Sequence, residues 1–201
     1  DNLWRNNMAE TNTNKATNVS TSSPKVTGAV YYAPLGTTLP TDAKTALDAA
    51  FKGVGYISEE GVTRSQSRSS NDIKEWGGGV VTTVQTEYKE SFKFKMIETL
   101  SDIVQKAVYG EKNVTGKLDG TTTASMTVKH NALEPVANAW VIDTVMLDGT
   151  LSRIVVPNAK ITELGDLAYK KDTAIGYDVT LSAMLDASGN TSYDYYQAPT
   201  A

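Results

Sequence analysis

The 201-residue chain contains no cysteine. This absence excludes disulfide bonds, thiolate zinc sites and cysteine nucleophiles, and it leaves the redox compartment undetermined. A single histidine, His130, excludes metal sites built from several histidines. Long apolar runs are missing too, since no stretch approaches the roughly 18 apolar residues of a membrane-spanning helix. We therefore expect no membrane partner, no metal and no cofactor.

An excess of basic residues is also absent. The net charge is −4 and the calculated pI is about 5.1, so the composition does not suggest a nucleic-acid-binding surface. Apolar residues make up 40% of the chain and charged residues 21%, as in an ordinary soluble globular protein. The length suffices for one domain with a substantial core.

The first residues differ in composition from the rest. Met8-Ala9-Glu10 resembles a translation start, so we expect residues 1–8 to be an added or upstream segment. Residues 9–25 are rich in Thr, Asn and Ser and cannot bury enough apolar surface to order alone. They predict a flexible N-terminal arm. Residues 26–196 are the expected β domain, followed by a C-terminal tail, 197–201.

Most of this domain alternates apolar and polar residues. "AIGYDVTLSAMLD" places six residues on one face, the pattern of a half-buried strand: Ile175, Tyr177, Val179, Leu181, Ala183 and Leu185. The stretch after it, "TSYDYY", is expected to return antiparallel to that strand. "YKESFKFKMIE" alternates in the same way, with its lysines pointing outward. These patterns predict a mainly β domain with antiparallel strands, either a sandwich or a barrel.

One segment carries a strong hairpin signal. Asp148-Gly149 lies between two apolar runs, which is typical of a tight β-turn. Farther along, the apolar phase changes from even positions at Ile154 and Val156 to odd positions at Ala159 and Ile161. The shift across Pro157-Asn158 predicts a β-bulge that bends a long strand.

A helical period interrupts the strands over residues 99–109. The apolar positions follow helical spacing and predict one face that packs on the sheet: Leu100, Ile103, Val104, Ala107 and Val108. Thr99 stands where an N-cap is expected, and Gly110 can end the helix. A weaker helical pattern covers residues 41–51.

The segment "EWGGGVV" raises the possibility of a ligand site. Its spacing is not that of a phosphate loop, and it precedes a strand rather than a helix. We therefore interpret Gly77, Gly78 and Gly79 as a bend, with Trp76 packing at a core edge or an interface. His130 is expected on the apolar face of its strand, partly buried. No spacing supports a Ser-His-Asp triad, so no enzyme is predicted.

The order of these features resembles a protein family. The stretches that carry the likeness are "APLGTTLPTDA", "FKFKMIETLSDIVQKAVYG" and "VPNAKITELGD…GYDVTLSAML…DASG". With the polar arm before them, they are similar to the major tail tube protein of long-tailed, siphovirus-like bacteriophages. The likeness covers most of residues 26–190, and none of these stretches is a catalytic motif.

The resemblance implies a structural virion protein. Family members fold as a β-sandwich-like barrel with a flanking helix, and six copies form a ring whose sheets join into one barrel. Rings stack into a tube, a passive conduit for double-stranded DNA during genome ejection. The implied partners are further copies of the chain, the tape measure protein, and the tail terminator and tail tip proteins. The implied location is the phage tail, after synthesis in the bacterial cytoplasm.

The resemblance also assigns inter-subunit roles. The arm and the extended loop 34–53 match the elements that bridge rings, which makes four apolar residues of the loop candidate contacts: Leu35, Leu39, Leu47 and Phe51. Six copies at −4 each carry −24, so a ring would repel DNA in transit.

A second interpretation stays open. The chain could be a β-sandwich module of a virion that binds carbohydrate or a receptor, using exposed aromatic residues as its platform. Trp76, Trp140 and the "YDYY" tail are the residues for such a platform, although Trp140 lies in an apolar strand and favours the core.

Overall fold

The computed structural model describes residues 14–199. Eleven strands, one α-helix and two short 3-10 helices occur in this part of the chain. Their order is η1 (Ala16–Asn18), β1 (Ser22–Pro24), β2 (Val30–Pro34), β3 (Lys52–Gly53), β4 (Ile57–Lys74), β5 (Val80–Met96), α1 (Asp102–Tyr109), η2 (Glu111–Asn113), β6 (Val114–Lys117), β7 (Ser125–Val128), β8 (Asn138–Met146), β9 (Leu151–Leu164), β10 (Tyr177–Ala183) and β11 (Tyr193–Gln197). None of the described helices is long and apolar enough to cross a membrane.

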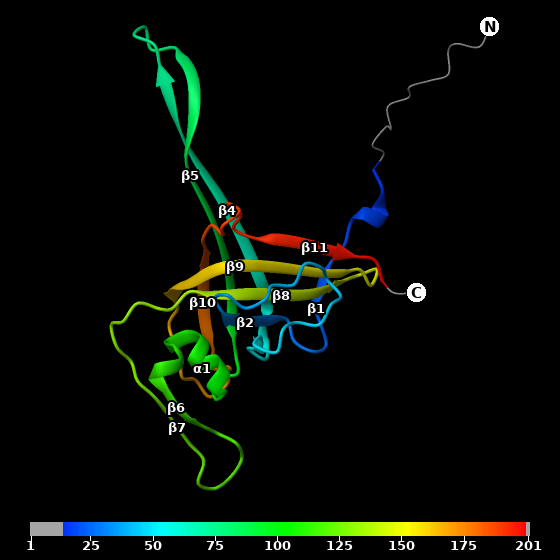
Figure 1. Ribbon diagram of the computed structural model, residues 1–201, viewed down its shortest axis with the longest axis vertical. Coiled ribbons are helices and arrows are strands. Elements are labelled where there is room, and N and C mark those ends of the chain that lie inside the picture. The colour runs from blue at the N-terminus through cyan, green and yellow to red at the C-terminus, as the bar shows by residue number, and fades with distance from the viewer. Residues whose placement is uncertain (1–13, 200–201) are drawn as a thin grey trace, which may run out of the picture.

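Nine strands form one antiparallel sheet with the order β3-β2-β8-β9-β10-β5-β4, while β1 pairs with β8 and β11 with β9. β6 and β7 form a separate two-stranded ribbon beside α1 (Figure 1). In Figure 1, β8, β9 and β11 run across the view, whereas β4, β5 and β10 cross that direction. The predicted mainly β fold with antiparallel strands and one helix is confirmed.

The change of strand direction begins at the bulge in β9. Trp140 pairs with Val156 and Asn138 pairs with Ala159, so β9 carries one extra residue at Pro157-Asn158. The predicted bulge is therefore confirmed, as is the β8–β9 hairpin, whose turn contains Asp148-Gly149. Because the bulge bends β9, β10 pairs with its second half and β11 with its first half.

The main core lies where the two parts of the sheet and α1 meet. Trp140 is fully buried, with the rings of Tyr32 and Phe94 at centroid distances of 5.4 and 6.0 Å. Val104, Ala107 and Val108 contribute the buried face of the helix, and Ile103 packs at its margin. This core excludes Trp140 from any exposed aromatic platform.

The helix is shorter than predicted. It starts at Asp102 with Ser101 as its N-cap, and it ends at Gly110, whose φ is 88°. The Gln105 side chain donates a hydrogen bond to the Thr99 carbonyl at 2.5 Å, so residues 99–101 form the turn before the helix. Leu100 consequently lies outside the helix and is 71% exposed. The expectations for Thr99 and Leu100 were wrong.

The weaker helix predicted over residues 41–51 does not form. The Asp42 carboxylate accepts hydrogen bonds from the backbone N–H groups of Lys44 and Thr45, and Asp48 accepts one from Ala50. Such local side-chain bonds replace the backbone bonds that a helix would need. The segment is an irregular loop.

Three further expectations need correction. The "TSYDYY" stretch pairs with β9 and not with the strand that precedes it. His130 follows β7 and is exposed, with its ring edge-on to Tyr109 at 4.4 Å, because the strand ends at Val128. Part of the predicted arm belongs to the sheet, since residues 22–24 pair with β8. Residues 1–13 and 200–201 lie outside the described residues.

Candidate assembly surfaces

The hairpin of β4 and β5 extends far beyond the core (Figure 1). Its proximal half contributes Phe92, Phe94 and Met96 to the core. In its distal half, residues 66–87 are exposed on both faces. At about 3.3 Å per residue, the eight residues from Arg68 to the tip span about 25 Å.

The outer half of the hairpin carries apolar side chains that its own chain does not cover. These are Ile73, Trp76, Val80, Val81 and Val84, with exposed fractions from 48% to 104%. Trp76, the most exposed of them, occupies the tip and not a core edge of its own subunit. A solvent-facing group of this kind marks an interaction surface.

The turn accounts for the three glycines. The Glu75 N–H donates to the Gly79 carbonyl at 2.8 Å, and the Gly78 N–H donates to the Glu75 carbonyl at 2.9 Å. Gly78 has a φ of 92°, which side-chain-bearing residues rarely adopt. The structure therefore places Gly77–Gly79 in a tight turn, with Trp76 as the large side chain at a narrow tip.

A buried carboxylate fixes the base of the hairpin. Glu90 is 1% exposed and accepts hydrogen bonds from Arg64 at 2.5 Å, from Gln66 at 3.0 Å and from the hydroxyl of Thr191. Arg64 also donates to Asp194 at 2.7 Å, which connects β4 to the C-terminal strand. Burial favours the neutral acid, but these hydrogen bonds outweigh it and hold the pKa of Glu90 below its ordinary value.

The loop 34–53 is held by a buried ion pair. Arg153 donates from Nε and from a terminal nitrogen to both carboxylate oxygens of Asp143, at 2.6 and 2.8 Å. Its other terminal nitrogen donates to the carbonyls of Asp42 and Thr45, at 3.0 and 2.8 Å. Arg153 is 1% exposed. One guanidinium therefore binds the loop to the outer face of the sheet.

Apolar residues of the loop pack on the same face. Phe51 is 9% exposed and belongs to a second core cluster, with Leu39 and Leu47 partly buried against it. Leu35 is 49% exposed and stands apart from this cluster. Of the four candidate contacts between subunits, Leu39, Leu47 and Phe51 therefore pack within their own subunit, whereas Leu35 does not.

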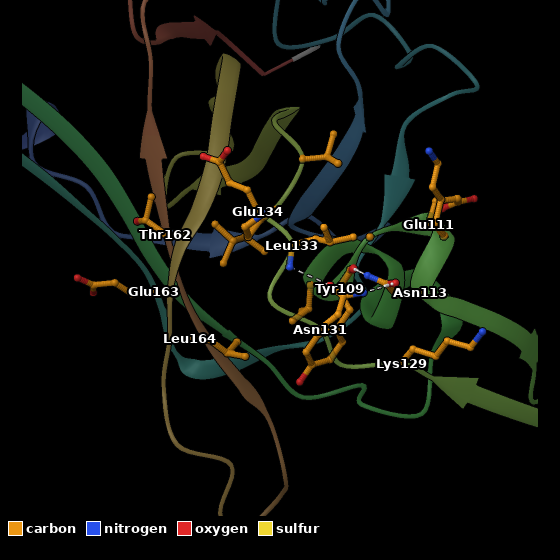
Figure 2. Close-up of a pocket in the computed structure, with 16 residues that line it drawn as sticks. Tyr109, Glu111, Asn113, Lys129, Asn131, Leu133, Glu134, Thr162, Glu163 and Leu164 are labelled. Atoms are coloured by element: carbon orange, nitrogen blue, oxygen red, sulfur yellow. Dashed lines mark hydrogen bonds between the residues drawn. The ribbon is translucent and has the colours of Figure 1, made fainter.

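A hollow of about 560 Å³ lies between the end of α1, the segment 129–136 and the end of β9 (Figure 2). Its apolar lining includes Leu133, Val136 and Leu164, which are 76%, 70% and 41% exposed. Tyr109 lines it from the helix, and burial raises the pKa of that phenol. These residues were missed by sequence reasoning. The signal for Leu133 and Val136 was the apolar content of "NALEPVANA", which fits neither a strand period nor a helix period.

Two asparagines hold the segment at this hollow in place. Asn113 donates to the Tyr109 carbonyl at 2.7 Å, and Asn131 donates to the Asn113 side chain at 2.8 Å (Figure 2). The Lys129 N–H donates to the Asn113 carbonyl at 2.8 Å. Side-chain and backbone hydrogen bonds therefore fix the segments around the hollow, which is present in a single subunit.

Within residues 14–199, no group of three or more His, Asp or Glu side chains could hold a metal ion. The described part of the chain is thus a β-sheet protein with a projecting apolar hairpin, a preformed hollow and a long open edge at β4. These are features of proteins that bind other proteins or copies of themselves.

The comparison with protein families agrees with a protein that binds other proteins or copies of itself. The model of the family "Phage tail tube protein" matches residues 13–199, and the chain belongs to that family. It is a structural protein of the phage tail, located in the virion, where it assembles with further copies of itself. A search of the curated proteins finds no sequence that matches the chain.

Proposed function

We propose that six copies of this chain form a ring and that rings stack into the tail tube. The observation that carries this proposal is that the main path of the nine-stranded sheet ends in two open strands, the short β3 (two residues) and the long β4 (18 residues). β3 pairs only with β2, and β4 pairs only with β5 among the described residues. Unpaired strand edges bind other strands readily. Joining such edges between copies would close a barrel around a lumen if the rotation per copy closes the ring.

The tube would act as a passive conduit for double-stranded DNA and would enclose the tape measure protein. It would end at the tail terminator protein on one side and the tail tip proteins on the other. A net charge of −4 per chain supports passive transit, because phosphate neutralisation by clustered cations drives non-specific DNA binding. The lysines predicted to face outward are partly matched by acids of their own chain, as with Lys93 and Asp178 at 3.4 Å.

Electron microscopy of the purified protein tests the assembly. Six-fold rings or tubes are the expected result, and a dispersed monomer at high concentration would contradict the proposal. A gel-shift titration with duplex DNA at two salt concentrations tests the passive conduit. We expect no binding at either salt, whereas binding that weakens steeply with salt would overturn the passive mechanism.

The alternative of a carbohydrate- or receptor-binding module has less support. Trp140 is buried, and Tyr193 and Tyr195 pack against the second core cluster. Within residues 14–199, Trp76 at the hairpin tip then has no neighbouring aromatic ring of the kind that a sugar platform needs. Glycan-array binding by a monomeric protein would favour this alternative.

A further inference from the structure

We infer that the tip of the β4–β5 hairpin docks in the hollow beside α1 of a second copy of the chain, with Trp76 as the buried anchor. This inference rests on the proposed function, because it names the two surfaces through which copies contact each other. The occupant of the hollow is then the Trp76 side chain at the tip of the hairpin of another subunit.

The placement of the two surfaces supports this contact. In Figure 1 the hairpin tip lies at one end of the long axis, and α1 with the β6–β7 ribbon lies toward the other. An antiparallel two-fold pair would close both contacts in a dimer, whereas copies stacked in one direction, as in a tube, bring the tip of one copy to the hollow of the next. Copies stacked in this way make a heterologous, head-to-tail contact, which continues from copy to copy.

Size and polarity also match. The hollow of about 560 Å³ falls within the range that holds a compact ligand group, and its lining by Leu133, Val136 and Leu164 suits an indole ring. The glycines that follow Trp76 add no side-chain bulk, so the narrow tip can enter. Aromatic residues in such pockets contribute a large share of binding free energy at protein interfaces.

Charge complementarity specifies the orientation. Figure 2 shows Glu134 on the β9 side of the hollow and Lys129 on the opposite side, with the side chains of Glu163 and Lys129 extending away from the centre of the hollow. Glu134 already pairs with Lys160, but Lys129 and Glu163 have no ion-pair partner within residues 14–199. The tip offers the adjacent Lys74 and Glu75, which are likewise without an ion pair in the described residues. With the tip in the hollow, Glu75 would face Lys129 at its rim.

The absence of native cysteine allows a direct test by cross-linking. The variant Gly77→Cys/Leu133→Cys places one thiol at the tip and one in the hollow, and a disulfide requires Cα atoms within about 7 Å. Under mild oxidation we expect a ladder of covalent multimers on a non-reducing denaturing gel. Each single variant can give only dimers. The control pair Gly77→Cys/Thr122→Cys carries its second thiol in the exposed β6–β7 turn, outside the hollow, and should give no ladder.

A second test uses the anchor itself. Trp76→Ser should lower the yield of sedimentable assemblies by about tenfold or more, while Trp76→Phe retains most of it. Leu133→Asp, in the hollow, should lower the yield of sedimentable assemblies by as much as Trp76→Ser does. Circular dichroism of each subunit should equal that of the wild type, since Trp76 and Leu133 are exposed.

The outcomes separate this inference from the proposed function. Suppose that Trp76→Ser forms tubes as well as the wild type does, and that Gly77→Cys/Leu133→Cys (the hollow pair) gives no ladder. This result would overturn the docking and leave the tube proposal intact. If the hollow pair gives a ladder while the wild-type protein forms no rings or tubes, the docking is supported and the tube proposal is contradicted. Equal ladders from the hollow pair and the control pair would also overturn the docking.

Discussion

The loop 34–53 and the tip of the β4–β5 hairpin look alike in the sequence but differ in the structure. Both carry apolar residues in segments rich in Gly, Thr or Pro, and both were candidates for contacts between subunits. In the structure, Phe51 of the loop is 9% exposed and Trp76 of the tip is 104% exposed. The loop packs on its own sheet, whereas the tip has no surface of its own chain to cover it.

The difference comes from what lies beneath each segment. The loop covers the outer face of β8 and β9, where Arg153 donates to its carbonyls and a second core cluster receives Phe51. The hairpin leaves the sheet where β10 ends its pairing with β5 at Ser91. Beyond that point β5 has only β4 beside it. The loop 34–53 therefore stabilises its own subunit, whereas the projecting β4–β5 hairpin can contact a partner.

The largest expected effect comes from removing the guanidinium that holds the loop. Arg153→Met leaves the Asp143 carboxylate buried without its main partner, so the free energy of unfolding should fall by about 3–5 kcal/mol. Urea denaturation measures this loss of unfolding free energy. Adding Asp143→Leu to this variant should recover part of the loss, because the unpaired charge is then gone. A loss below about 1 kcal/mol for Arg153→Met would contradict the anchoring of the loop.

The loop's apolar contact should have the next largest effect. Phe51→Ala should lower the free energy of unfolding by about 3 kcal/mol and increase amide exchange across residues 37–50. Leu35→Ala is the matched control in the same loop, and because Leu35 is 49% exposed its effect should stay within about 0.5 kcal/mol. Equal losses from the two variants would show that the loop does not pack as described.

The base of the hairpin should respond to pH. Glu90→Gln removes the charge that Arg64, Gln66 and Thr191 stabilise, so unfolding free energy should fall by about 2 kcal/mol at neutral pH. The pKa of Glu90 is lower in the folded state than its ordinary value of 4.5. This stabilisation is therefore fully present above about pH 4.5 and disappears as the pH falls through the folded-state pKa.

The difference in stability between wild type and Glu90→Gln should accordingly shrink in acid, as urea denaturation across a pH series would reveal. Glu87→Gln is a suitable control on the same strand, because that carboxylate is exposed beside Lys89 and should show no such gap. A gap that stays constant from neutral to acid pH would mean that the Glu90 charge does not contribute.

The smallest effect on the subunit is expected at the tip. Trp76→Ser should change the unfolding free energy of the dissociated subunit by no more than about 0.5 kcal/mol, since the side chain is fully exposed. Thermal unfolding at a concentration below that of assembly would measure it. A loss above about 1 kcal/mol would place the indole against its own subunit and remove the contrast with the loop.

Several features were predictable because they depend on local patterns. The Asp148-Gly149 turn sets the register of β8 and β9, and this register pairs Asp143 with Arg153 across the hairpin. The cross-strand ion pair could have been found in the sequence by counting outward from that turn, although it was not. The bulge at Pro157-Asn158 was found because one inserted residue moves the apolar side chains that follow it from even to odd positions.

Other features were not predictable, because they depend in part on residues far away in the chain. The weak helical pattern of residues 41–51 does not give a helix, because the Asp42 carboxylate accepts hydrogen bonds from backbone N–H groups of the segment. Arg153, which lies more than a hundred positions away in the chain, also donates to a carbonyl of this segment. The hollow beside α1 joins three segments that no local pattern connects.

By itself the sequence determined the class of fold, the helix with its buried face at Val104, Ala107 and Val108, and the resemblance to tail tube proteins. These follow from alternation, helical period and motif order, which are properties of neighbouring residues. The tertiary structure alone decided which apolar segment is buried and which projects. Burial depends on whether a sheet face lies beneath a segment, and the strand order of the sheet puts such a face under Phe51 but not under Trp76.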